Sequence, residues 1–97
     1  MLDQITARMG AAVAKADFPH TVKFDFGNDG KVFIDGPAKI VNNEDVEAKT
    51  TISIAIDDFV KMAQGELNST TAFMSGKLKV AGDMSVAMQL GPLLSDA

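Results

Sequence analysis

The chain has no cysteine and only one histidine, His20, among its 97 residues. Without cysteine there is no disulfide framework, no thiolate metal site and no cysteine nucleophile, and the redox compartment stays open. His20 stands at the start of a predicted strand, and no serine lies in the sequence context of a nucleophile elbow. We therefore expect no enzymatic activity, no catalytic residue, no metal and no cofactor.

An excess of basic residues is also lacking, because nine Lys and Arg stand against 13 Asp and Glu, for a net charge of −4. Nucleic-acid binding usually needs a basic face, so we expect no nucleic-acid partner. No apolar run reaches the roughly 18 residues of a membrane span. Asp3, Gln4 and Arg8 interrupt what would be the apolar centre of a signal peptide. The cytoplasm is the expected compartment.

What the chain does contain is the composition of a folded domain, with 46% hydrophobic and 23% charged residues. The length suits a single domain, 1–97, with one core. Residues 2–15 form its predicted first helix, and Pro19 ends it by holding Phe18 extended. Its apolar residues recur at helical spacing: Leu2, Ile5, Met9, Ala12, Val13 and Ala16. We expect this helix to pack on the domain, because membrane-surface helices are usually richer in Lys and Arg.

Alternating apolar and polar residues predict strands after this helix. Residues 22–26 and 32–34 flank Asn28-Asp29-Gly30 and form a β-hairpin. A calcium loop is not expected there, because Gly27 and Gly36 occupy positions that need oxygen ligands. Short strands follow over 38–41 and 46–54.

A helix is predicted from Asp57-Asp58, with Phe59 and Met62 on its apolar side and Gly65 at its end. Asn68 or Ser69 then caps a further helical turn.

The stretch 71–90 contains the densest set of signals. Gly76 can end a helical turn, and Leu78 and Val80 alternate with lysines as in a strand with one buried face. Gly82 ends that strand and Asp83 caps a helix, which carries Met84, Ala87 and Met88 on one side. These elements are predicted to point Phe73, Met74, Leu78, Val80, Met84 and Met88 into one apolar space.

The sum is an α+β fold of five strands and four helices, with helices on one face of the sheet and a polar outer face. The sheet and helices occupy 18–90 and a short tail 91–97. Phe33 is the apolar exception on the outer face, and we expect Leu93 or Leu94 to shield it.

Residues 57–90 resemble the sterol carrier protein 2, or non-specific lipid-transfer, family. The similarity lies in Asp58-Phe59, Gly65, Ala72-Phe73, Gly76-Lys77-Leu78-Lys79, Gly82 and Ala87-Met88, and more weakly in Val32-Phe33-Ile34-Asp35. The resemblance implies a five-stranded mixed sheet with an apolar tunnel between sheet and helices. It also implies a non-catalytic domain that binds sterols, fatty acids, fatty acyl-CoAs or phospholipids with loose selectivity.

With this resemblance, an apolar cavity is favoured over a solid core. Four of the six methionines lie at 62–88, and flexible thioether side chains can repack around ligands of different shape. The predicted lining residues are Phe24, Ile34, Phe59, Met62, Phe73, Met74, Val80, Met84 and Met88. An empty cavity of roughly 400 Å³ would cost about 10 kcal/mol, close to the whole stability of a small domain. We therefore expect the ligand-free protein to collapse, admit water or retain lipid.

The expected partners are a lipid or fatty-acyl ligand and, transiently, a membrane. Two alternatives stay open: a solid α+β interaction module, and an accessory subunit that delivers acyl-CoA to a lipid-metabolising enzyme.

Overall fold

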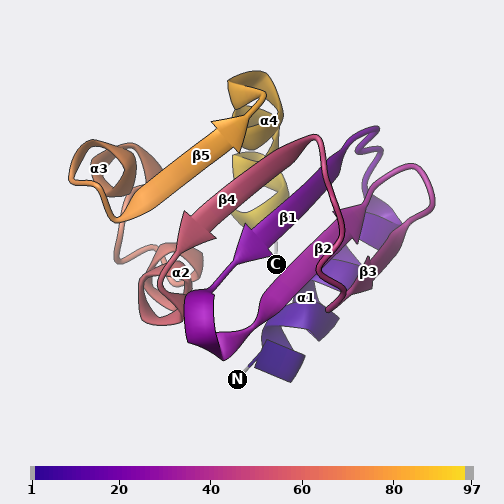
Figure 1. The fold of residues 1–97 in the computed structure, drawn as a ribbon, viewed down its shortest axis with the longest axis horizontal. Coiled ribbons are helices and arrows are strands. Elements are labelled where there is room, and N and C mark those ends of the chain that lie inside the picture. Colours follow the sequence, from indigo (N-terminus) through magenta and orange to yellow (C-terminus); the bar gives the residue numbers. More distant parts are fainter. Residues whose placement is uncertain (1, 96–97) are drawn as a thin grey trace.

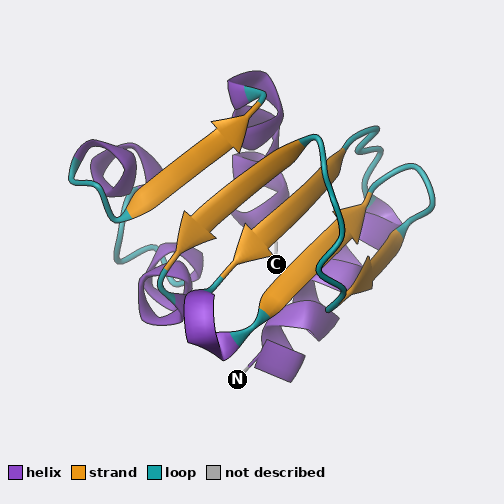
Figure 2. Ribbon diagram, in the orientation of Figure 1, coloured by secondary structure: helices purple, strands orange, loops and turns teal. Residues whose placement is uncertain are grey.

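The structure, a computed structural model, describes residues 2–95, and for Ser69 and residues 90–95 it describes the backbone only. Its elements are α1 (Leu2–Lys15), β1 (Thr21–Asp25), the 3-10 turn η1 (Gly27–Asp29), β2 (Lys31–Asp35), β3 (Ile40–Asn42), β4 (Thr50–Ile54), α2 (Ile56–Ala63), α3 (Ser69–Met74), β5 (Leu78–Gly82) and α4 (Met84–Ser95). Figures 1 and 2 show the strands in one layer, with α1 and α4 behind them. The predicted α+β fold is confirmed.

The sheet has the order β3-β2-β1-β4-β5. β1 pairs with β4 in parallel, whereas the other neighbours are antiparallel, so the sheet is mixed as the resemblance implied. The predicted hairpin is β1 with β2, which turns through η1. One row of inner-face residues crosses the four longer strands in register: Val32, Phe24, Ile52 and Val80.

The core lies between this inner face and the helices. α1 contributes its buried residues Ile5, Met9 and Val13, so it packs on the domain as its apolar spacing predicted. Asn43 holds α1 beside the sheet, because its side-chain amide donates hydrogen bonds to Thr6 Oγ1 and to the carbonyl of Lys31, both at 2.9 Å.

The helix ends follow their local sequence signals. Gly65 and Gly76 have φ of +80° and +82°, the left-handed conformation that ends α2 and α3. Asn68 caps α3 by accepting hydrogen bonds from the Thr70 and Thr71 amides. Asp83 Oδ1 accepts one from the Ser85 amide at 2.9 Å, at the start of α4.

The C-terminal prediction was wrong in its boundary. A tail was expected over residues 91–97, but α4 continues to Ser95. α4 packs against α1, β4 and β5, and tertiary contacts of this kind override local breaking preferences. The predicted cover of Phe33 by Leu93 or Leu94 concerns side chains outside the described residues.

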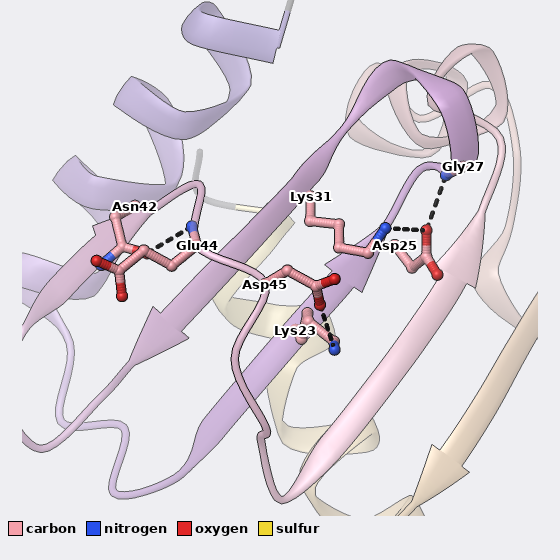
Figure 3. A network of polar contacts seen from close by, with 7 residues as sticks. All are labelled: Lys23, Asp25, Gly27, Lys31, Asn42, Glu44 and Asp45. Atoms are coloured by element: carbon pink, nitrogen blue, oxygen red, sulfur yellow. Dashed lines mark hydrogen bonds and ion pairs between the residues drawn. The ribbon is translucent and has the colours of Figure 1, made fainter.

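The connection from β3 to β4, residues 43–49, crosses the outer face over β2 and β1 (Figure 1). Lys23 Nζ on β1 binds Asp45 Oδ1 in this connection at 2.8 Å (Figure 3). The amide of Lys49 donates to Thr21 Oγ1 at 2.9 Å. Phe33, the register partner of Lys23, shares this face and is half-buried.

The Lys23–Asp45 contact predicts a measurable shift in the pKa of Asp45. The hydrogen bond from Lys23 lowers the pKa of the Asp45 carboxyl below its ordinary value. The contact therefore stabilises the fold at pH values above that ordinary pKa. This contribution disappears as pH falls through the lowered pKa. In a carbon-detected NMR titration, Lys23→Gln should raise the pKa of Asp45, whereas Lys15→Gln on α1 should leave it unchanged. An Asp45 that titrates alike in both variants would contradict the contact.

Candidate functional site

Three phenylalanines form a buried cluster between the sheet and α2. Phe59 of α2 makes edge-to-face contacts with Phe24 and Phe26, with both centroid distances at 5.4 Å. Phe24 and Phe26 stack on each other at 5.9 Å. All three are at most 5% exposed, and Ile34 is fully buried. The predicted lining residues Phe24, Ile34 and Phe59 thus lie in the packed core, together with Phe26, which was predicted as a strand residue but not as lining.

The helical cover is less complete over β5 than over β4. Ile52 and Ile54 of β4 are 4% and 5% exposed. Their register partners on β5, Val80 and Leu78, point to the same face but are only half-buried. Because paired residues share one face of a sheet, this difference comes from what covers each strand. The inner face of β5 is therefore an incompletely covered apolar strip at the edge of the sheet.

The two helices that contact β5, α3 and α4, carry exposed apolar side chains. Phe73 and Met74 of α3 are 46% and 80% exposed, and Met84 and Met88 of α4 are 43% and 73% exposed. We call Phe73, Met74, Met84 and Met88 the exposed apolar set.

This arrangement corrects the prediction that the four side chains point inward. α3 buries Ala72 completely, and α4 buries Val86, which is 1% exposed. Met84 and Met88 do share a helix face, but Val86 lies two residues from each, about 200° around the helix. The smaller Ala72 and Val86 allow α3 and α4 to approach the sheet closely, which leaves the longer side chains outside.

Of the other predicted lining residues, Met62 on α2 and Val80 on β5 are half-buried and pack against the core. They lie at the margin of the core. Residues 84–95 contain no charged residue, so α4 adds no charge to this region. Among the described residues, no group of three His, Asp or Glu could hold a metal ion, and no helix is long and apolar enough to cross a membrane.

A buried threonine determines where α4 starts. Thr50 is completely buried, and its hydroxyl donates to the carbonyl of Asp83 at 2.9 Å while accepting from the Asp83 amide at 3.2 Å. These bonds join β4 to the residue before α4. Gly82 also allows a close approach, because its φ is +110° and a Cβ there would lie 2.4 Å from the carbonyl oxygen of Lys49.

Comparison with known protein families identifies the family of this chain. The profile of the SCP-2 sterol transfer family matches residues 2–95. The chain belongs to this family. The resemblance seen in residues 57–90 is thus confirmed over nearly the whole chain.

Relatives by sequence match about half of this SCP-2 domain. Hydroxysteroid dehydrogenase-like protein 2 from Bos taurus is 49% identical over 49 residues, which are 50% of this chain and 12% of that protein. Sterol carrier protein 2 from Homo sapiens is 40% identical over 55 residues, 57% of this chain and 10% of that protein. The matched region is a small part of both relatives.

Solved structures share the fold at low identity. The crystal structure of Sterol Carrier Protein 2 Like 2 from Aedes aegypti matches with a TM-score of 0.82 and 16% identity, over 94% of both chains. The solution structure of Sterol Carrier Protein-2 from Aedes aegypti, in complex with palmitate, matches with a TM-score of 0.79 and 20% identity, over 96% of this chain and 93% of that chain.

The Thr50 hydrogen bonds lead to a stability prediction. Thr50→Val keeps the side-chain shape but leaves the Asp83 amide without its partner, so the free energy of unfolding should fall by about 1–3 kcal/mol. Thr51→Val, on the outer face of the same strand, should change it by less than about 0.5 kcal/mol. Urea unfolding measures both, and hydrogen exchange should show faster opening at Met84–Val86 in Thr50→Val alone. Equal stability of the two variants would mean that Thr50 does not anchor α4.

Proposed function

We propose that this SCP-2 domain binds a lipid with a long acyl chain along the inner face of β5 and carries it without chemical change. The observation that carries the proposal is the half-burial of Leu78 and Val80 beside the buried Ile54 and Ile52. An acyl chain laid on this strip would complete the apolar cover that the helices leave unfinished. The expected compartment, the cytoplasm, stays a prediction.

The exposed apolar set supplies the walls of the proposed site. Phe73 of α3 and Met84 and Met88 of α4 are exposed and would have to turn toward β5 to contact the ligand, while Met62 and Val80 pack against the core. Methionine changes rotamer at small cost, so Met84 and Met88 can fold over ligands of different width. The buried Phe24, Ile34 and Phe59 would form the floor of a tunnel in the ligand-bound state. Met74 is the most exposed of the set, at 80%.

The energetics suit reversible carriage. Each methylene removed from water contributes about 0.8 kcal/mol, but a lipid that comes from a bilayer gains little by moving to another apolar site. Exchange between membrane and protein would then be nearly balanced. The palmitate complex of the related mosquito protein shows that this fold can hold such a chain, and the ligand class proposed here follows it.

Val80 provides a direct test of the ligand strip. Val80→Asn should weaken binding of palmitate about tenfold, because losing the apolar contact of one valine costs about 1.5 kcal/mol and 1.4 kcal/mol is a factor of ten. Displacement of a fluorescent fatty acid gives the dissociation constants. Val46→Asn, which makes the same change on the outer-face connection, is the matched control and should bind as the parent protein does. If the two variants bind palmitate equally, the ligand does not lie on β5.

The purified protein should retain lipid from its expression host. Native mass spectrometry is expected to show a species heavier than the polypeptide, and organic extraction should release acyl lipids from it. A protein that remains free of lipid and rigid, and that takes up no palmitate, would favour the alternative of a solid interaction module.

A second candidate function follows from the relatives. Hydroxysteroid dehydrogenase-like protein 2 contains its matching segment within a protein about eight times longer than that segment. A domain of this kind could present a bound lipid to an enzyme that is fused to it or associated with it. Transfer of palmitoyl-CoA to a purified acyl-CoA-consuming enzyme, faster with this protein than by free diffusion, would favour this role over bulk carriage.

A further inference from the structure

We propose that the corner where α3 meets β5 docks the protein on anionic lipid bilayers. The corner consists of Phe73 and Met74 at the end of α3 and of Lys77 and Lys79 around the start of β5. All four side chains are exposed, and Met74, at 80%, has the highest exposure of any large apolar side chain among the described residues. This inference rests on the proposed function, because a lipid carrier must meet a membrane.

The backbone holds the corner in one shape. The Lys77 amide donates to the Ala72 carbonyl at 2.9 Å, and the Gly76 amide donates to the Phe73 carbonyl at 3.2 Å. With Gly76 at φ +82°, this is the Schellman pattern that closes a helix. Ala72 is completely buried and anchors α3 to the domain. Phe73 and Met74 are therefore presented to solvent on a fixed turn and need no ordering on contact with a bilayer.

Charge distinguishes this corner from the rest of the surface. Residues 67–82 hold two lysines and no acidic residue, so the remaining chain, with seven basic and 13 acidic residues, has a formal charge of −6. Neither Lys77 nor Lys79 forms an ion pair with a described residue. Ser53, the register partner of Lys79 on β4, is uncharged. An anionic membrane would repel most of the molecule and attract this segment, which orients the corner toward the lipid.

The chemistry fits a bilayer better than a protein partner or a second copy of the chain. Apolar tips flanked by lysines match the layers of a membrane interface, with headgroup phosphates above and acyl chains below. A second copy that met this corner with the same surface would bring its own Lys77 and Lys79 against these lysines, and like charges repel.

The corner also adjoins the proposed ligand strip. Leu78 lies between the two lysines and points to the inner face, where Val80 continues the strip. Docking through Met74 would thus bring the end of the strip to the bilayer surface, so that an acyl chain could pass between them with little exposure to water.

Vesicle sedimentation tests the docking face with the full chain. The parent protein should bind vesicles of phosphatidylcholine with added phosphatidylglycerol more tightly than vesicles of phosphatidylcholine alone, and added salt should weaken this binding. The double variant Lys77→Gln/Lys79→Gln should reduce the partition coefficient about tenfold. Arg8→Gln/Lys15→Gln removes the same charge from exposed positions of α1 and should not reduce it.

A second pair of matched variants tests the apolar part of the corner. Met74→Ser should reduce vesicle binding about tenfold, whereas Ile40→Ser, at a 50% exposed position on the opposite edge strand, should have no such effect. Thermal unfolding checks that both variants fold. Equal effects of Met74→Ser and Ile40→Ser, or a loss only in the α1 variant, would overturn the proposal.

Palmitate displacement, measured on the same variants without vesicles, separates the two proposals. Normal palmitate binding by all variants, with no selective vesicle defect at the corner, would reject the docking face and leave the carrier function standing. A selective vesicle defect in a protein that never binds palmitate would support the docking face and reject the carrier function. Binding of the corner to a protein, without affinity for anionic vesicles, would also overturn the proposal.

Discussion

The parallel pairing of β1 with β4 is the constraint on which the arrangement of this domain depends. It places β4 beside the first hairpin strand while β3 lies at the far edge, so the β3–β4 connection has to cross two strands. That connection occupies the outer face, where Lys23 holds Asp45. The same pairing moves β5 to the opposite edge, where it has one strand neighbour and a thinner helical cover.

The two halves of the sheet consequently differ in how well they are covered. The β1–β2–β3 half meets α1, whose Ile5, Met9 and Val13 complete a dense core. The β4–β5 half meets α4, which approaches through the small Val86 and Ala87 and turns Met84 and Met88 outward. The second half retains unburied apolar surface, which costs stability in water and is useful only if another apolar partner covers it.

This difference between the two halves of the sheet suits the proposed role, in which a bound lipid must also be released. The packed half, whose Phe24 and Phe26 contact Phe59 of α2, would keep the fold while side chains at the β5 edge rearrange around the proposed ligand. Methionine supplies this freedom, because its three rotatable bonds and polarisable sulfur tolerate several packings. The turn at Gly76 separates Met74 from Leu78 on the apolar strip of β5 by only a few residues.

Local signals were enough to predict the order of the elements, the hairpin, the caps at Asn68 and Asp83, and the helix-ending role of Gly65 and Gly76. Each of these depends on neighbours within about five residues, which the chain order specifies directly. Strand alternation likewise identified Leu78 and Val80 as facing inward, because alternate residues share one face and the apolar ones are expected on the buried face. The family resemblance added that the sheet would be mixed.

Only the tertiary structure decided which sides of α3 and α4 meet the sheet. The spacing of Met84 and Met88 indicates that they share a face of α4. In the folded chain Val86 faces the interior instead, because its shorter side chain lets the helix approach the sheet closely. The length of α4 beyond Gly91-Pro92 and the thin cover of β5 depend on the same long-range contacts. Those contacts join residues more than thirty positions apart, such as Thr50 and Asp83, and no local pattern in the sequence specifies them.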